Sequence, residues 1–388
     1  MELTILMPCL NEERTLKTCI NKAQEFLNTN NVDGEILIAD NGSTDNSQAI
    51  VNELHAQDAR VRLTTVSERG YGAALIAGCN NANGKYVIMG DADDSYNFLN
   101  LMPFLEKLRD GYDLVMGNRF KGGIEKDAMP PLHKYLGNPV LSFIGRLLYK
   151  SNIKDFHCGL RGYNKESILK LDLHTLGMEY ASEMVVKATL NKLKIIEVPT
   201  TLSKDGRDRP PHLRSWSDGW RHLTFLLMHS PLWLFLLPGI ILMTIGLVSG
   251  IIITICDVTV FGLHFDVNTL IYAAASTIIG FQLVLYYILT KKYAATTKFI
   301  PATKIDNSLI KLTMNKGIFI GMILFLIGII SSIIAVIIWS NHNFGDLDAS
   351  YMLRITIPAL TTLICGIQLM FSSFFIGILE IKTKRNNK

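Results

Sequence analysis

The feature that most constrains this chain is a series of four long apolar stretches in its second half. They cover roughly residues 233–256, 269–290, 318–339 and 355–378, and none has a charged residue near its centre. A helix needs about 20 apolar residues to cross a bilayer, and a helix buried in a soluble domain normally keeps a polar face. The pattern therefore predicts an α-helical membrane domain of four transmembrane helices over residues 233–388.

Charged residues are distributed unevenly along the 388 residues. The part from Trp233 onward holds 11 of the 38 basic and 6 of the 34 acidic side chains, which leaves 27 and 28 in the front part. A nearly neutral front domain argues against nucleic-acid binding, which requires a basic surface. The six cysteines include no Cys-x-x-Cys pair, which argues against a disulfide framework or a zinc site. The opening apolar run, Leu3–Leu10, is too short for a signal peptide, so none is expected.

The loops between the apolar stretches predict the orientation. Six lysines and one aspartate lie between the second and third stretches, in residues 291–316, and four more basic residues lie in the tail after residue 381. The other two connections are mainly acidic. Loops rich in Lys and Arg stay in the cytoplasm. We therefore expect a multi-pass protein of the plasma membrane with both termini and the front domain in the cytoplasm.

The segment 216–232 joins the two halves. It mixes Trp216, Trp220 and several leucines with Arg221 and His222, directly before the first apolar stretch. This composition is typical of an amphipathic helix at the membrane surface, and a core helix of the front domain is the alternative. The front domain itself is then expected over residues 1–215.

Short apolar runs alternate with helical patterns in this front domain. Strands are expected near residues 3–7, 35–39, 61–66, 86–89 and 114–116, with amphipathic helices between them. The alternation predicts an α/β fold with a mostly parallel sheet. Ligands of such sheets bind at the carboxyl ends of the strands, so the residues that follow each strand are the functional candidates.

The strongest candidate site follows the fourth expected strand. Asp91 and Asp93 are two residues apart, so in an extended turn both carboxylates point the same way. Hard cations such as Mg²⁺ bind carboxylate oxygens together with substrate phosphate oxygens. A solvated acidic turn or a helix cap is the alternative for so short a motif, but its place after an apolar strand favours a metal site.

The first two strands are followed by other polar motifs. Asp40 is placed where a carboxylate can accept hydrogen bonds from a ribose or a base. The residues after it, up to Asp45, are typical of a turn and a helix cap. Both roles are compatible. The first strand leads into Asn11-Glu12-Glu13 rather than into three glycines, which disfavours a nicotinamide dehydrogenase.

In this order, Pro8-x-x-Asn11-Glu12-Glu13, the Asp40–Asp45 run and Asp91-x-Asp93 resemble inverting glycosyltransferases of family 2. With its four spans the chain is similar to the polyprenyl-phosphate glycosyltransferases, such as dolichol-phosphate mannose synthases and bactoprenol glucosyltransferases. The resemblance implies a GT-A catalytic domain, with a Rossmann-like mixed sheet, ahead of the membrane domain. It also implies a nucleotide-sugar donor, Mg²⁺ or Mn²⁺, and an undecaprenyl or dolichyl phosphate acceptor.

The resemblance also implies roles for single residues. The donor nucleotide would contact six of them: Pro8, Leu10, Glu12, Asp40, Asp91 and Ala92. Asp91 and Asp93 would hold the metal, with Asp93 the more direct ligand. Arg119, after the fifth strand, would lie near the phosphates, and Arg161, in the run Cys158–Gly162, would lie near the acceptor. The expected catalytic residues are Asp93, Arg119 and Arg161.

A lipid phosphate is already anionic, so it needs no general base; the help it needs is positioning and neutralisation of charge. Arg161, Lys204 and Arg207 are the expected acceptor-phosphate residues, because guanidinium and ammonium groups suit phosphate oxygens. A basic patch that touches anionic lipids is the alternative for the 204–207 region. We assign Glu183 either to structure or to a contact with the donor sugar, and His157 at most to the support of ligand-binding groups.

The sequence thus predicts inverting sugar transfer from a nucleotide sugar, with UDP-glucose as first candidate, to a polyprenyl phosphate at the cytoplasmic membrane face. The product would supply cell-surface glycosylation. One alternative is a processive polysaccharide synthase, but its Gln-x-x-Arg-Trp element is absent from the chain. The other is a non-catalytic membrane sensor of nucleotide sugars, which the Asp91-x-Asp93 pair disfavours. Membrane lipid is an expected partner, nucleic acid is not, and a homo-oligomer is compatible with the sequence.

Overall fold

The computed structural model consists of two compact units, Met1–His229 and Ser230–Lys388. It describes the whole chain except residues 208–214, 257, 261–262, 298–310 and 382–388. Lys298, Lys304 and the basic residues of the tail, on which the expected orientation partly depends, lie outside the described residues. The first unit carries all the motifs that follow the strands.

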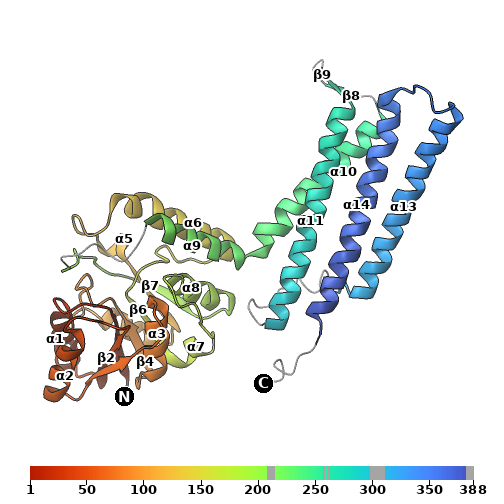
Figure 1. Ribbon diagram of the computed structural model, residues 1–388. Coiled ribbons are helices and arrows are strands. Elements are labelled where there is room, and N and C mark those ends of the chain that lie inside the picture. Colours follow the sequence, from red (N-terminus) through yellow and green to blue (C-terminus); the bar gives the residue numbers. More distant parts are fainter. Residues whose placement is uncertain (208–214, 257, 261–262, 298–310, 382–388) are drawn as a thin grey trace. The chain divides into compact units, whose positions relative to one another are not determined.

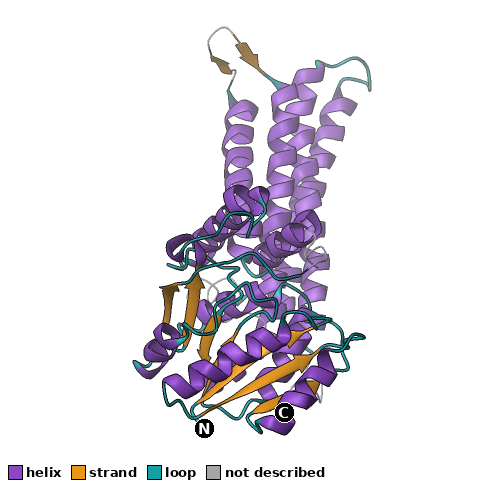
Figure 2. Ribbon diagram, turned by 90° about the vertical axis from the view of Figure 1, so that its left-hand side faces the viewer, coloured by secondary structure: helices purple, strands orange, loops and turns teal. Residues whose placement is uncertain are grey.

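A single seven-stranded sheet organises the first unit, in the order β3-β2-β1-β4-β6-β5-β7 (Figures 1 and 2). Its strands are β1 (Leu3–Cys9), β2 (Gly34–Asp40), β3 (Val61–Thr65), β4 (Tyr86–Met89), β5 (Leu114–Asn118), β6 (Arg161–Asn164) and β7 (Ile195–Pro199). The β6 strand is antiparallel to β4 and β5, and the other pairs are parallel. The expected Rossmann-like, mixed and mostly parallel sheet is confirmed.

Helices cover both faces of this sheet, so its central strands are buried on both sides, as parallel strands usually are. The helices of the first unit are α1 (Leu16–Thr29), α2 (Ser47–Gln57), α3 (Tyr71–Asn81), α4 (Met102–Arg109), α5 (Arg119–Gly122), a π-helical turn (His133–Gly137), α6 (Asn138–Tyr149), α7 (Lys165–Leu169), α8 (Tyr180–Leu190) and α9 (Ser215–Met228). Helix α1 illustrates why these segments are helices that pack on the sheet. Its apolar residues recur at helical spacing from Leu16 to Leu27, and all of them are buried.

The direction of chain travel through the sheet reverses beside β1. Strands β2 and β3 extend the sheet on one side of β1, and β4 pairs with its other side. The loops that leave β1 and β4 therefore diverge at the carboxyl edge and leave room between them. Asn11 after β1 and Asp91 after β4 are brought to the same opening in this way.

Helix α9 has the two faces that its composition suggests. Within the first unit it packs against α6 and α8, burying Phe225 and Leu226, while Trp216 and Trp220 stay 80% and 66% exposed. The amphipathic interpretation and the core-helix interpretation therefore each describe one face. The compact first unit reaches His229, beyond the boundary expected at residue 215.

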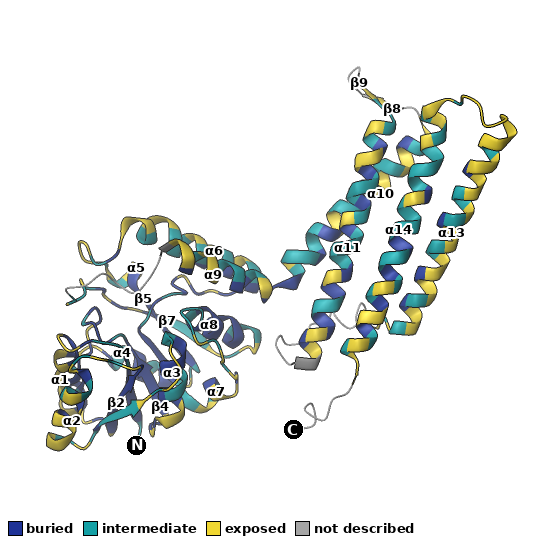
Figure 3. Cartoon of the chain, viewed as in Figure 1, coloured by how far each residue is buried: buried dark blue, intermediate teal, exposed yellow. Residues whose placement is uncertain are grey.

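The second unit consists of long helices and a short hairpin of β8 (Val258–Val260) and β9 (Leu263–Phe265). The helices are a π-helical turn (Leu232–Leu236), α10 (Leu237–Ile255), α11 (Val267–Thr297), α13 (Met314–Asn341) and α14 (Ala349–Leu379). Among the described residues, four helices are long and apolar enough to cross a membrane, as expected. Much of their apolar surface is exposed (Figure 3), as helices in lipid require. Gly321 and Gly366 let α13 and α14 approach closely, because a Cβ at either would meet backbone of the other helix within 3 Å.

Candidate active site

A cleft of about 690 Å³ opens at the carboxyl ends of β1, β2 and β4, and we call it the donor cleft. Five of the six residues expected to contact the nucleotide line it: Pro8, Leu10, Glu12, Asp91 and Ala92. Its far wall comes from Gly177 and Met178 before α8 and from Ser217, Asp218 and Arg221 of α9. Sequence reasoning did not assign that wall to the site.

Asp40, the sixth expected residue, is buried and does not line the donor cleft. Its carboxylate accepts hydrogen bonds from the backbone N–H groups of Gly42 and Ser43, each at 3.2 Å, and from the Gln48 amide at 2.7 Å. Gly42 has φ of +87°, which favours glycine. The turn role of Asp40 is therefore present in the structure, while its contact with a nucleoside stays a prediction.

Asn41 links two loops of the donor cleft, a role that sequence reasoning missed. Its side-chain oxygen accepts from the Gly70 N–H at 2.7 Å, and its amide nitrogen donates to the Glu68 carbonyl at 2.7 Å. A carboxylate could make the first bond but not the second, because it has no donor. Asn41 thus fixes the loop after β3 against the end of β2, and Tyr71 of that loop reaches the acidic turn.

The acidic turn holds both carboxylates at the edge of the donor cleft. Asp91 Oδ1 accepts from the Tyr71 hydroxyl at 3.1 Å, and Asp93 Oδ1 accepts from the Ser95 backbone N–H and hydroxyl at 3.1 and 2.6 Å. Burial, and then the charge of Asp93, raises the pKa of Asp91 to about 6. The turn is therefore a place where negative charge is concentrated and only partly compensated.

This donor set fits a hard divalent cation that also binds substrate. The described residues include no group of three or more His, Cys, Asp or Glu arranged to hold a metal, so these residues would contribute the two carboxylates of Asp91 and Asp93. Mg²⁺ is usually held by one or two carboxylates, with phosphate oxygens and waters completing its octahedron. Gly159 leaves this edge open, because a Cβ there would lie 2.5 Å from Asp91 Oδ2.

Arg207, from the loop after β7, bridges two carboxylates of the donor cleft. Its Nη1 lies 2.9 Å from Asp93 Oδ2, and its Nη2 lies 2.7 Å from Glu12 Oε1. The loop is also held through its backbone, because the Gly206 N–H donates to the Asp93 carbonyl at 2.9 Å. Arg207 was expected at the acceptor phosphate, but the structure places it on the donor side, while Lys204 of the same loop is exposed.

Arg161 is placed differently from the expectation. Its side chain is fully buried and donates to three backbone carbonyls, those of Cys158 at 2.7 Å, Ala181 at 2.7 Å and Phe156 at 2.9 Å. A guanidinium in this position ties β6, α8 and the preceding loop together and has no surface for a ligand. We therefore correct the assignment of Arg161 from acceptor-phosphate and catalytic residue to structural residue. Glu183 is likewise structural, since it is buried and bonded to Lys187 and Thr175.

Arg119 begins α5, directly after β5. Its Nε and Nη2 donate to the two carboxylate oxygens of buried Asp155 at 2.8 and 2.7 Å, a bidentate pair. Arg119 was expected near the phosphates, but it does not line the donor cleft; it lines a second cavity, of about 220 Å³, that lies within the first unit. We call it the histidine cavity because its lining includes His133, His157 and His222, besides Asp218.

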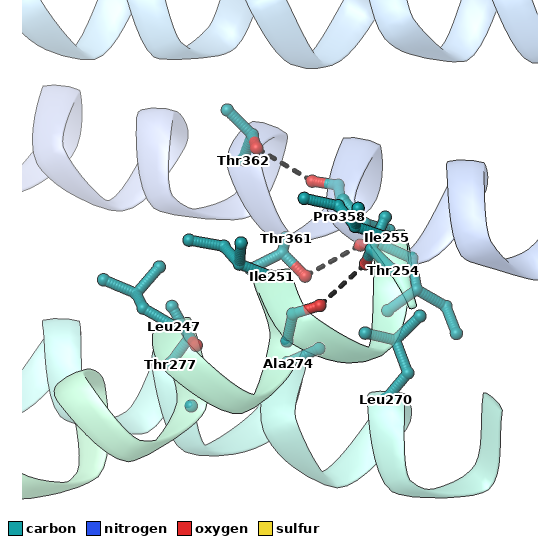
Figure 4. A pocket seen from close by; sticks show the side chains of 13 residues that line it. Leu247, Ile251, Thr254, Ile255, Leu270, Ala274, Thr277, Pro358, Thr361 and Thr362 are labelled. Carbon is teal, nitrogen blue, oxygen red and sulfur yellow. Dashed lines mark hydrogen bonds between the residues drawn. The ribbon is translucent and has the colours of Figure 1, made fainter. Parts of the chain in front are cut away.

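A further cavity, of about 300 Å³, lies in the second unit among α10, α11 and α14 (Figure 4). The hydroxyl groups in its lining belong to four threonines: Thr254, Thr277, Thr361 and Thr362. Each donates to the carbonyl four residues earlier in its own helix, at 2.7 to 2.9 Å. The cavity therefore presents mainly hydrocarbon and carries no group for catalysis.

The α/β sheet, the acidic turn in its cleft and the four apolar helices define a membrane-bound glycosyltransferase of the GT-A fold. Comparison with known proteins agrees: residues 4–171 match the model of glycosyl transferase family 2, and residues 288–380 match the C-terminal transmembrane region of family 2 glycosyltransferases. The low-salt glycan biosynthesis hexosyltransferase Agl6 of Haloferax volcanii is 31% identical over 378 residues, covering 97% of this chain and 89% of that protein. The chain therefore belongs to glycosyltransferase family 2.

Two other similar proteins cover the chain in part. A UDP-N-acetylglucosamine–dolichyl-phosphate N-acetylglucosaminyltransferase of Methanococcus voltae is 30% identical over 214 residues, which are 50% of this chain and 83% of that protein. Among solved structures, the glucosyl-3-phosphoglycerate synthase of Mycobacterium tuberculosis, crystallised with Mn²⁺, UDP and phosphoglyceric acid, aligns with a TM-score of 0.44. It is 18% identical and covers 58% of this chain and 77% of that one.

Proposed function

We propose that this enzyme transfers a sugar from a nucleoside-diphosphate sugar to a polyprenyl phosphate, with inversion at the anomeric carbon, at the cytoplasmic face of the plasma membrane. The observation that carries the proposal is that the donor cleft and the histidine cavity adjoin, since Met178 and Asp218 line both. One side offers carboxylates suited to a cation that would in turn bind a diphosphate. The other offers a guanidinium and imidazoles suited to a second phosphate.

The donor side supports a nucleotide sugar. Asp91 and Asp93 would hold Mg²⁺ or Mn²⁺, which when bound neutralises a diphosphate and so improves it as a leaving group. Arg207 lies beside them and has a planar fork of donors that suits phosphate oxygens. UDP-glucose stays the first candidate donor, and the uridine nucleotide in the name of the Methanococcus voltae relative favours UDP over GDP.

The acceptor side supports a phosphate that arrives from the membrane. Apolar side chains are exposed on the two helices that flank the histidine cavity, among them Phe143 of α6 and Trp216 and Trp220 of α9. Such faces bind the headgroup region of a bilayer. The anionic oxygen of a lipid phosphate attacks without a general base, so positioning by Arg119 and the cavity lining is the help that it needs. The dolichyl phosphate in the name of the same relative agrees with this acceptor, and we propose that the product supplies cell-surface glycosylation.

A panel of labelled donors tests the proposal directly. Membranes containing the full chain would receive UDP-glucose, UDP-galactose, UDP-N-acetylglucosamine or GDP-mannose, with undecaprenyl or dolichyl phosphate and Mg²⁺. We expect one donor to yield a labelled, solvent-extractable lipid that requires both the added lipid phosphate and the cation. Label in a water-soluble polymer would instead indicate a processive synthase, and nucleotide binding without transfer would indicate a sensor.

A further inference from the structure

A chain of three polar side chains lines and supports the histidine cavity, and the mechanism above does not use it. Ser182 of α8 lies between two imidazoles, with its Oγ 2.9 Å from His222 Nδ1 on α9 and 3.3 Å from His157 Nε2. The two rings meet edge to face, with centroids 4.6 Å apart. Ser182 is fully buried, and both histidines line the cavity.

The protons of this chain cannot satisfy all of its nitrogens. A serine hydroxyl has one proton, so Ser182 donates to one imidazole and accepts from the other. If it donates to His222, then His157 carries its proton on Nε2 and its Nδ1 is a bare lone pair. If it donates to His157, then His157 Nδ1 carries a proton. In either case His157 Nδ1 is buried without a hydrogen-bond partner among the described residues, which costs about 1–3 kcal/mol.

An anion in the histidine cavity removes this deficit, because its oxygen can accept from a proton on His157 Nδ1. We propose that His157, Ser182 and His222 form a relay that recognises the acceptor phosphate, with His157 Nδ1–H as the donor, and that the relay takes up a proton from solvent when the phosphate dianion binds. The inference rests on the proposed function, since it treats this cavity as the acceptor site. It assigns positioning roles to three residues. Two of them, Ser182 of α8 and His222 of α9, lie on helices and outside the motifs that follow the strands.

The charge of the surroundings explains why a proton is needed. Arg119, the fixed cation among the described lining residues, is already paired with Asp155, and Asp218 of the lining lies 3.9 Å from Arg221. Among the described lining residues, a dianion that enters therefore meets little uncompensated positive charge. The groups of the described lining that can gain charge near neutral pH are imidazoles: His157 and His222 of the relay, and His133.

The imidazoles are neutral before the phosphate binds. The charged groups that face them are Arg119 after β5, Arg161 of β6, Glu179 beside α8 and Asp218 of α9. Burial is the largest influence and lowers the pKa of both histidines; the other ring and the two arginines lower that of His157 further, whereas Glu179 and Asp218 oppose the effect at His222.

A bound dianion acts in the opposite direction and raises the pKa of the imidazole beside it. The contribution of the protonated relay to lipid-phosphate binding is therefore complete below the pKa of the unbound relay. It is lost as the pH rises through the higher pKa of the bound relay. A phosphate monoester has its second pKa near 6, so it is half dianionic at that pH and almost fully dianionic about one pH unit higher. This change is the same for the wild type and for every variant, so the relay is what makes their profiles differ. The KM for lipid phosphate is expected to increase with pH.

The test measures the KM for undecaprenyl phosphate and for the nucleotide sugar from about pH 6 to 8.5, using the full chain in lipid nanodiscs. For the wild type we expect the lipid-phosphate KM to rise about tenfold or more over this range, as loss of a charge-assisted hydrogen bond implies. Ser182→Ala should raise that KM at pH 6 and flatten its pH dependence, with the donor KM unchanged within about twofold. His222→Asn keeps a hydrogen-bonding group but removes one of the two titrating rings of the relay, so it should reduce the pH dependence, with a smaller rise at pH 6.

His55→Asn is the matched control, because His55 is an exposed histidine of the same unit whose ring contacts the Val61 carbonyl. The pH dependence of its KM for lipid phosphate should match that of the wild type. Thermal unfolding midpoints check that each variant is folded. Lipid-phosphate KM profiles of Ser182→Ala and His222→Asn that run parallel to the wild type would overturn the relay while leaving the proposed function standing. Failure of the proposed function looks different: no chain, wild type included, would transfer sugar to lipid phosphate at any pH.

Discussion

The donor cleft and the histidine cavity adjoin, yet they handle charge in opposite ways. The donor cleft holds full charges that compensate one another in part, with Arg207 between Glu12 and Asp93. The histidine cavity holds groups that are mostly neutral, and the charge of Arg119 is already matched by Asp155. The difference indicates two ways to bind a phosphate: exchange of an existing ion pair on the donor side, and acquisition of a proton on the acceptor side.

The largest effect is expected from Asp93→Asn. Loss of a cation ligand should lower kcat for sugar transfer by about 100- to 1,000-fold, because stabilisation of the leaving diphosphate is lost. The KM for lipid phosphate should change little, since Asp93 pairs with Arg207 of the donor cleft. Asp94→Asn is the control, because Asp94 lies in the same turn but pairs with Lys22 at 2.7 Å. Equal losses in both variants would mean that the turn matters for folding rather than for the cation.

Arg161→Met should act on stability. Three backbone carbonyls would lose a buried donor, so the free energy of unfolding of the first unit should fall by about 3–5 kcal/mol. Arg109→Met provides the contrast, since Arg109 forms an exposed pair with Glu2, and its loss should cost about 1 kcal/mol or less. Thermal unfolding of both variants measures the difference. A stable Arg161→Met enzyme with a raised KM for lipid phosphate would restore the role that the sequence suggested.

Arg207→Gln should separate cation binding from turnover. Arg207 holds Asp93 Oδ2, so its removal frees that oxygen, and half-maximal activity should need about three- to tenfold less Mg²⁺. The maximal rate should nevertheless fall, because a donor for phosphate oxygens is gone. Activity titrated with Mg²⁺ measures both quantities. Lys170→Gln, which loses only an exposed ion pair with Glu166, should alter neither, and an unchanged Mg²⁺ requirement in Arg207→Gln would contradict the ion-pair exchange.

The smallest effect is expected on stability in mild acid. Burial lowers the pKa of His157 and of His222 below the usual 6.5, so below that pH the unfolded chain binds protons that the folded chain does not. The free energy of unfolding should therefore fall as the pH drops from about 7 to 5. His157→Asn should reduce this slope, and His55→Asn should not. Unfolding curves at several pH values measure how the free energy of unfolding depends on pH. Identical pH dependence in the wild type, His157→Asn and His55→Asn would show that the histidines are not buried in the neutral form.

The contrast between the two sites also explains what the sequence could predict. The donor side follows from local pattern, because Glu12 and Asp91 come just after buried strands and the sheet brings strand ends together. The histidine cavity has no local signature, since Arg119, His157 and His222 lie on segments far apart in the chain and meet only through the packing of α6, α8 and α9. Arg161 was misassigned for a related reason: the carbonyl of Ala181, which helps to bury its guanidinium, comes from another element.

The central claim is that a divalent cation, held by Asp91 and Asp93, binds the diphosphate of the donor. Electron paramagnetic resonance of Mn²⁺ with UDP and the full chain tests it most directly, because ³¹P couplings report phosphate oxygens in the coordination sphere. The account predicts bound Mn²⁺ with ³¹P couplings in the wild type and in Asp94→Asn, and loss of that signal in Asp91→Asn and Asp93→Asn. A bound Mn²⁺–UDP signal that is unchanged in Asp91→Asn and Asp93→Asn would contradict it.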